Sequence, residues 1–274
     1  MRIEEGGKDA SGQDKRSTGV RSMNSVLSTL RVFEEVALRQ PIGVSELSRV
    51  TNIPKSSAQR CLVTLQQAGW LRAVDPEHAR WGVTMKALAL GLRGAGEQDL
   101  REVAGPVIKR LAAETDETVH LGLRDGEDYV VVAREDSTHV VRVFLDIGTR
   151  LPLQATSGGV AIMAHLEAAE VDQLLRRELE EFAEFAEFPV PDSDELRQEI
   201  ARTAERGYAL NVSSSWYRPH VSSIAAVVTN SAEQPIAALT LSMPEIRYDS
   251  AREKDLAHLV IAAADEISRL VSSA

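Results

Sequence analysis

The chain has 274 residues, which is long enough for two domains. Its formal net charge of −10 at pH 7 argues against a general nucleic-acid binder. Its single cysteine, Cys61, excludes an intramolecular disulfide, and no apolar run approaches the roughly 18–20 residues that span a membrane. Residues 1–19 are polar and lack the apolar core of a signal peptide, so we expect a disordered tail and a soluble, cytoplasmic protein.

Residues 20–85 are predicted to contain a first helix and then a helix-turn-helix. The first helix covers residues 23–39, with its expected buried face at Val26, Leu30, Phe33 and Ala37. The helix-turn-helix combines residues 44–51 with residues 55–68, because Pro54 disfavours helix before it and Gly69 suits the left-handed position after a helix. The expected core positions of the two helices are Val44, Leu47, Val50, Ala58, Cys61, Leu62, Leu65 and Ala68. Cys61 is therefore interpreted as a small core residue and not as a reactive thiol.

The polar face of residues 55–68 contains no acidic side chain. It carries Lys55, Ser56, Ser57, Gln59, Arg60, Thr64 and Gln66. The alternative is a solvated helical hairpin, but such a face usually mixes Glu with Lys. The composition therefore favours a helix that lies in the major groove of DNA. We expect Ser57, Gln59 and Arg60 to face bases, whereas Lys55 and Thr64 are expected to contact phosphate.

Two short strands are predicted after Gly69, at residues 70–74 and 80–84, with a turn between them. This hairpin is the wing of a winged helix-turn-helix domain, mainly α in content. Arg72, His78 and Arg80 lie on the wing, within expected reach of phosphate. Residues 20–86 carry nine Lys or Arg and five Asp or Glu, a net charge of +4, whereas residues 87–274 carry −14. This uneven distribution of charge indicates that only residues 20–86, called the head below, contact DNA.

A helical linker is expected at residues 86–98, followed by a C-terminal domain at residues 99–274. A helical connection transmits orientation, which a flexible one does not. The predicted elements of the C-terminal domain are a helix at 98–115, strands at 118–124, 128–134 and 140–146, a loop at 148–153, a helix at 157–165, an acidic helix at 167–188, a helix at 194–205, strands at 208–212, 222–230 and 235–243, and a helix at 248–272. Helices packed on a mixed antiparallel sheet make this an α+β domain.

From about residue 20 onward the chain resembles the IclR family of bacterial transcriptional regulators. The matching stretches are SELSRVTNIPKSSAQRCLVTLQQAGWL, ETVHLGLRDGEDYVVVARED, GTRLPLQATSGGVAIMAH and RGYALN, with SSIAAVVTN and PIAALTLSMP after them. The resemblance implies a winged-helix head, a linker helix and a GAF/PAS-like domain that binds a small-molecule effector. It also implies operator DNA as a partner and a homo-oligomer, either a dimer or a pair of dimers.

The resemblance further implies which residues hold the effector. They are Thr156, Ser157, Gly158, Asn211, Ser223, Thr240 and Ser242. Ser223 stands where the family usually has cysteine, and Asn211 where it often has aspartate. The segment 212–217 departs from the family, since an acidic pair is replaced and Trp216 and Tyr217 add aromatic surface. With Arg218 and His220 as added cations, these departures suggest an anionic effector with an apolar or aromatic body; the alternative is that Trp216 and Tyr217 pack at an interface.

The predicted function is ligand-coupled binding of operator DNA, more often in repression than in activation. An enzyme carrying a DNA-binding head is the main alternative, but the sequence has no G-x-S-x-G, P-loop, G-x-G-x-x-G or H-E-x-x-H motif. No cofactor is expected. A metal-dependent sensor built on His120, His139 or His220 with a carboxylate stays open, as does a ligand-free structural dimer, which would have no cavity behind Ser157.

Overall fold

The computed structural model describes residues 22–75, 78–94, 100–177, 193–212 and 220–273. The chain divides into two compact units, Met1–Gly94 and Ala95–Ala274. The predicted tail at 1–19, the acidic stretch after residue 177 and the altered segment 213–218 lie outside the described residues.

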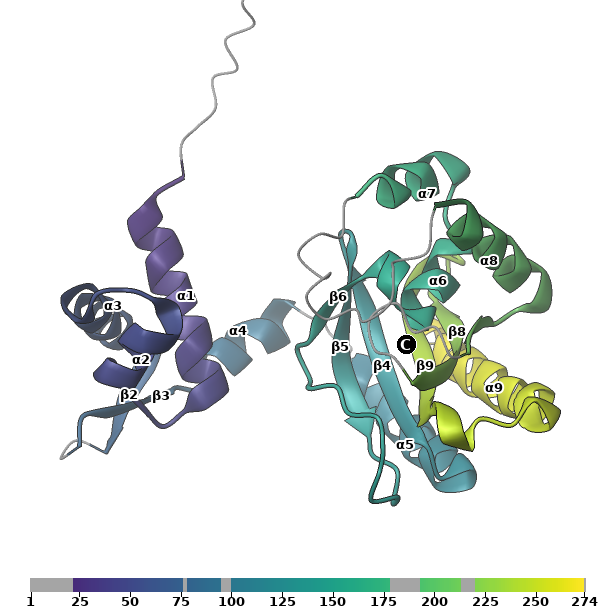
Figure 1. The fold of residues 1–274 in the computed structure, drawn as a ribbon, viewed down its shortest axis with the longest axis horizontal. Coiled ribbons are helices and arrows are strands. Elements are labelled where there is room, and N and C mark those ends of the chain that lie inside the picture. The colour runs from purple at the N-terminus through teal and green to yellow at the C-terminus, as the bar shows by residue number, and fades with distance from the viewer. Residues whose placement is uncertain (1–21, 76–77, 95–99, 178–192, 213–219, 274) are drawn as a thin grey trace, which may run out of the picture. The chain divides into compact units, whose positions relative to one another are not determined.

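The first unit contains the predicted helix-turn-helix and wing (Figure 1). Its elements are α1 (Asn24–Arg39), β1 (Ile42–Gly43), α2 (Val44–Thr51), α3 (Lys55–Gln67), β2 (Leu71–Asp75), β3 (Arg80–Val83) and α4 (Lys86–Gly94). The strand order is β1-β3-β2, so a short strand before α2, which was not predicted, joins the wing into a three-stranded sheet. The turn between α2 and α3 has Asn52 in the left-handed conformation, and Ser48 Oγ donates to the carbonyl of Ile53 at 2.6 Å.

The buried face of α1 differs from the prediction. Val32 and Val36 are fully buried, whereas Val26 and Leu30 are about half exposed and Ala37 is exposed. Apolar residues occur on more than one face of this helix, and the core of the unit reaches only its C-terminal half. In α2 and α3 the core prediction holds for Leu47, Ala58, Leu62 and Leu65, with Val44, Val50 and Cys61 partly buried. Ala68, at the helix end, is exposed.

The second unit is a six-stranded antiparallel sheet of order β6-β5-β4-β9-β8-β7 with helices on both faces. Its strands are β4 (Thr118–Asp125), β5 (Asp128–Glu135), β6 (Arg150–Pro152), β7 (Ala209–Asn211), β8 (Val221–Thr229) and β9 (Pro235–Pro244). Its helices are α5 (Leu100–Thr115), α6 (Ser157–Met163), α7 (Ala168–Leu175), α8 (Ser193–Arg206) and α9 (Glu253–Ser272), with 3₁₀ turns η1 (Leu153–Ala155), η3 (Glu245–Arg247) and η4 (Ser250–Arg252).

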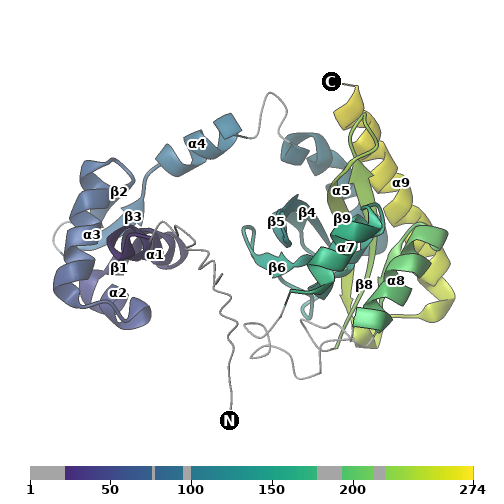
Figure 2. The same cartoon turned by 90° about the horizontal axis from the view of Figure 1, so that it is seen from above.

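Each face of this sheet has its own hydrophobic core. The α5 and α9 helices cover one face, and Figure 2 shows them side by side there. The α6, α7 and α8 helices pack against the other face. The three-layer arrangement leaves the start of α6 lying over the polar ends of β8 and β9, which is where the site described below is formed.

Three local predictions for this unit were wrong. Residues 140–146 form no strand; instead β6 lies within the predicted loop, where Leu151 pairs with Tyr129 of β5. The last helix begins at Glu253 and not at 248, because two 3₁₀ turns precede it. The helix predicted at 167–188 ends at Leu175 within the described residues, as α7.

Candidate functional site

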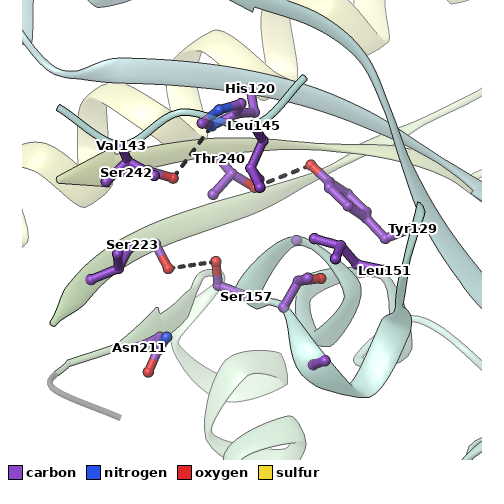
Figure 3. Close-up of a pocket in the computed structure, with 14 residues that line it drawn as sticks. His120, Tyr129, Val143, Leu145, Leu151, Ser157, Asn211, Ser223, Thr240 and Ser242 are labelled. Atoms are coloured by element: carbon purple, nitrogen blue, oxygen red, sulfur yellow. Dashed lines mark hydrogen bonds between the residues drawn. The ribbon is translucent and has the colours of Figure 1, made fainter. Parts of the chain in front are cut away.

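A cavity of about 50 Å³ lies in the second unit, between the start of α6 and the sheet (Figure 3). Its polar lining is His120, Tyr129, Thr156, Ser157, Asn211, Ser223, Thr240 and Ser242. Gly158 and the apolar side chains Val143, Leu145, Leu151, Ala155 and Val221 complete the lining. All seven residues predicted to hold an effector therefore border one cavity, although they come from α6 and three different strands.

Strand register explains why these residues meet. Asn211 pairs with Ser223, and Ser223 pairs with Ser242, so three polar residues of β7, β8 and β9 form one row. Thr240 lies two residues before Ser242 on β9, and it pairs with His120 of β4. Because side chains alternate between the two faces of a strand, both rows point toward α6. The sheet therefore presents two adjacent rows of hydrogen-bonding groups to the cavity.

The start of α6 contributes hydroxyls from the opposite side. Ser157 Oγ and Ser223 Oγ lie 2.8 Å apart and share a hydrogen bond (Figure 3). Thr156 Oγ1 caps the helix by accepting a hydrogen bond from the backbone N–H of Gly159 at 2.9 Å. This cap fixes Ser157 and Gly158 at the cavity wall. A ligand-free structural dimer was expected to have a filled pocket behind Ser157, and the cavity does not favour that alternative.

Tyr129 forms a wall of the cavity that the sequence did not predict. Its ring lies against Gly122 and Gly158, where an added Cβ would approach ring carbons to 2.0 Å and 2.6 Å. Its hydroxyl lies 3.2 Å from the carbonyl of Ala238 and 3.3 Å from Thr240 Oγ1. The two glycines therefore make room for the ring, and the hydroxyl contacts hold it across the sheet.

Burial raises the pKa of Tyr129 to about 12, whereas its hydrogen bond with Thr240 acts in the opposite direction. Tyr129 ionises near pH 10 in the unfolded chain and near pH 12 in the folded chain. Its contribution to the free energy of unfolding is therefore fully present below pH 10 and is lost as the pH rises from 10 to 12. We expect the free energy of unfolding to fall by about 2–3 kcal/mol through this group. Urea unfolding at pH 9 and pH 11.5 measures the loss, which should be smaller in Tyr129→Phe. Equal losses in the two proteins would contradict the assignment.

Several lining residues were missed because only the tertiary fold places them there. His120 was considered only as a metal ligand, yet its Nδ1 lies 3.4 Å from Ser242 Oγ on the cavity side of β4. In the sequence, His120 lies two residues after Thr118 on the predicted strand, so the two polar side chains share one face of it. That shared face was the signal that could have placed His120 at the cavity. His220, expected near the pocket, instead lies with Glu245 in a separate hollow at the surface. Within the described residues no cluster of His, Cys, Asp and Glu could hold a metal ion.

In the first unit, the predicted DNA-facing side chains of α3 are all exposed. They are Lys55, Ser56, Ser57, Gln59, Arg60 and Thr64. Ala58, Leu62 and Leu65 occupy the opposite face and anchor the helix in the core. Ser57, Arg60 and Thr64 also border an open groove against α1. The helix therefore offers an acid-free polar surface to a partner while its apolar face is fully used in folding.

The two wing arginines differ in their surroundings. Arg72 is exposed on β2. Arg80 donates a hydrogen bond to the carbonyl of Pro41 at 2.9 Å, which ties the wing to the segment before β1. His78 at the wing tip lies 2.7 Å from Asp75. Lys86, at the start of α4, donates to the carbonyl of Ala68 at 2.7 Å and lies over the ring of Trp70.

Comparison with known families identifies both units. Residues 27–75 match the IclR helix-turn-helix domain, and residues 93–269 match the C-terminal domain of the bacterial transcriptional regulator IclR. The chain belongs to the IclR family. It is therefore a DNA-binding transcriptional regulator with an effector domain, and not an enzyme. None of its described helices is both long and apolar enough to cross a membrane.

Relatives of the IclR family match over nearly the whole chain. The transcriptional repressor IclR of Escherichia coli is 27% identical over 90% of this chain and 89% of its own length. The transcriptional regulator KipR of Bacillus subtilis is 30% identical over 94% and 98%. Among solved structures, the regulator RHA06195 of Rhodococcus sp. RHA1 is 26% identical with a TM-score of 0.71, covering 91% of this chain and 98% of that one.

A further IclR-family structure contains a bound small molecule. It is an IclR homologue from Microbacterium hydrocarbonoxydans complexed with 4-hydroxybenzoate. That protein is 21% identical to this chain, with a TM-score of 0.75 over 91% of this chain and 100% of its own. The likeness at this identity shows a shared fold.

Proposed function

We propose that this regulator is an operator-specific repressor whose DNA binding is controlled by a small organic acid in the cavity of the second unit. The observation that carries the proposal is the convergence of hydroxyl and amide groups on one cavity beside an apolar wall. Such a combination suits a ligand with a carboxylate and a short carbon skeleton. The homologue that binds 4-hydroxybenzoate supports the same class.

The charge of the cavity supports an anion. Among the described lining residues there is no Asp or Glu, so a carboxylate meets no like charge. The hydroxyls of Ser157, Ser223, Thr240 and Ser242 line the cavity. Ser157 and Ser223 hydrogen-bond to each other, so one of these two hydroxyls keeps its proton for a ligand, and a hydrogen bond to a charged acceptor is worth about 1.5–3 kcal/mol. The Oδ1 atom of Asn211 is buried and has no hydrogen-bond partner within the described residues. A hydroxyl group on the acid would satisfy it.

The cavity volume favours a short acid. Each water molecule needs roughly 10–15 Å³ of such space, so a cavity of about 50 Å³ holds the equivalent of about three to five waters. An acid of two to four carbons fits the cavity as it stands. An aromatic acid, which the departures at 212–217 suggested, requires the wall to move outward.

Exposed apolar side chains support a homo-oligomer. Val26, Leu27 and Leu30 lie on the N-terminal half of α1, and Leu88 and Leu90 lie on α4 of the same unit, each between 44% and 53% exposed. Apolar side chains exposed on two helices of one unit are typical of an interface. A second copy of the chain would cover it and place two α3 helices on related half-sites of the operator.

Calorimetry tests the effector class. The full-length protein is titrated with acetate, lactate, pyruvate, benzoate, 4-hydroxybenzoate and, as uncharged controls, glycerol and xylose. We expect an acid to bind and Ser223→Ala to weaken it by about 10-fold or more, because one charge-assisted hydrogen bond is lost. Ser222→Ala is the matched control, since Ser222 points to the other face of β8, where its hydroxyl is buried without a partner in the described structure. Binding by xylose or glycerol alone would reject the proposal.

A further inference from the structure

The segment between β5 and β6 forms one wall of the cavity. We call residues 139–147 the strap. Val143 and Leu145 of the strap line the cavity (Figure 3). Val143 is only 6% exposed. Its neighbours Val140 and Ile147 are 94% and 62% exposed. The strap has no strand or helix of its own, so contacts from elsewhere must decide which of its side chains face inward.

Arg134 of β5 holds one end of the strap. Its guanidinium donates to the carbonyl of Leu145 at 2.6 Å and lies 3.8 Å above the ring of Phe144. Asp136 pairs with the same group at 2.7 Å. The Arg134 side chain is 18% exposed, so these contacts are largely sheltered from water and are worth more than a surface pair.

Arg247 of η3 holds the other end. It donates to both carboxylate oxygens of Glu117, at 2.7 Å and 2.6 Å, and to the carbonyl of Val141 at 2.6 Å. The bidentate pair fixes the plane of the guanidinium, and Glu117 is almost fully buried. The donor that reaches Val141 is thereby aimed by a rigid partner.

The two arginines bind backbone carbonyls at positions 141 and 145, two residues on either side of Val143. Holding the backbone at both points leaves Val143 and Leu145 directed into the cavity. We propose that Arg134 and Arg247 are positioning residues of the effector cavity and set the size of the ligand that it admits. The inference depends on the proposed function only in calling the cavity the effector site.

The test measures access to the cavity without an effector. In full-length protein carrying Cys61→Ser and Ser223→Cys, the single thiol lies at the cavity wall. Its modification rate is measured with a small reagent, methyl methanethiosulfonate, and a bulky one, 5,5′-dithiobis(2-nitrobenzoate). We expect the bulky reagent to react much more slowly than the small one. Adding Arg134→Gln or Arg247→Gln should raise the bulky rate at least tenfold while the small rate changes by less than threefold.

Arg150→Gln is the matched control, because Arg150 on β6 pairs with Asp125 and Asp128 and makes no hydrogen bond or ion pair with the strap. It should leave both rates unchanged. Arg134→Lys, which keeps the charge but not the planar fork, should give an intermediate rate and serves if Arg134→Gln does not fold. An unchanged ratio of bulky to small rates in the arginine variants, or an equal change in Arg150→Gln, would overturn the inference. Because no acid or DNA is used, failure of the calorimetric test does not affect this result.

Discussion

Arg60→Ala is expected to weaken binding to the preferred operator by about 5- to 150-fold and to relax base preference at one position of each half-site. Arg60 is exposed on the acid-free face of α3, and a side chain that reads a base contributes about 1–3 kcal/mol of discrimination. Lys55→Ala, at the helix start, should instead weaken all sequences equally and lower the salt dependence by about one counterion per subunit.

Duplexes selected from a random pool by the full-length protein supply the operator for this comparison. Fluorescence anisotropy at several salt concentrations then gives affinity and salt slope for each variant. Arg39→Ala is the control, since Arg39 is the last residue of α1, pairs with Glu35 and is not among the residues predicted to contact DNA. If Arg60→Ala weakens selected and random duplexes equally, Arg60 contacts phosphate and not a base.

Gly159→Ala is expected to lower the free energy of unfolding of the effector domain by about 1–3 kcal/mol or more. An added Cβ would lie 1.9 Å from the carbonyl oxygen of Leu153, and a backbone atom cannot turn aside as a flexible side chain can. The start of α6 would have to move away from η1, displacing Thr156 and Ser157 from the cavity wall.

Urea unfolding followed by circular dichroism measures this effect. Gly91→Ala in α4 is the control, because nothing lies within 4 Å of its added Cβ and alanine is the better helix former. It should leave the effector-domain transition where it is in the unchanged protein. An unchanged transition in Gly159→Ala would show that α6 and η1 are not packed this closely.

The helix-turn-helix could be predicted to within a residue at most of its boundaries because its signals are local. Pro54 lies at the start of α3 and Gly69 follows its end, each through its own backbone preference, and α2 and α3 begin at residues 44 and 55 as expected. The buried face of α1 could not be predicted. Its sequence offers apolar residues on more than one face, and only the position of the core selects Val32 and Val36.

The strap is a second feature that could not be predicted from the sequence. Val140, Val141 and Val143 give residues 140–146 the β-branched composition of a strand, and sequence reasoning predicted one. Its backbone carbonyls instead accept hydrogen bonds from Arg134 and Arg247, which lie outside the segment in sequence. Hydrogen bonds from side chains outside the strap therefore take the place of hydrogen bonds to a neighbouring strand. The sequence of the strap itself does not indicate them.

Only some of the residues that line the cavity could be predicted from the sequence. The resemblance supplied Ser157, Ser223 and Thr240 with the other implied residues, and strand register brings them to one place. Tyr129 was not predicted because its position depends on space left by Gly122 and Gly158, which are distant from each other along the chain.

Occupancy of this cavity is proposed to control DNA binding by the first unit. The direct measurement is the affinity of the full-length protein for its selected operator with and without a saturating concentration of the acid found by calorimetry. We expect a change in Kd of about 5- to 150-fold, which corresponds to the range of about 1–3 kcal/mol typical of coupling between sites. This change should be lost in Ser223→Ala at the same acid concentration. An acid that binds the protein fully while leaving the operator Kd unchanged would contradict the proposal.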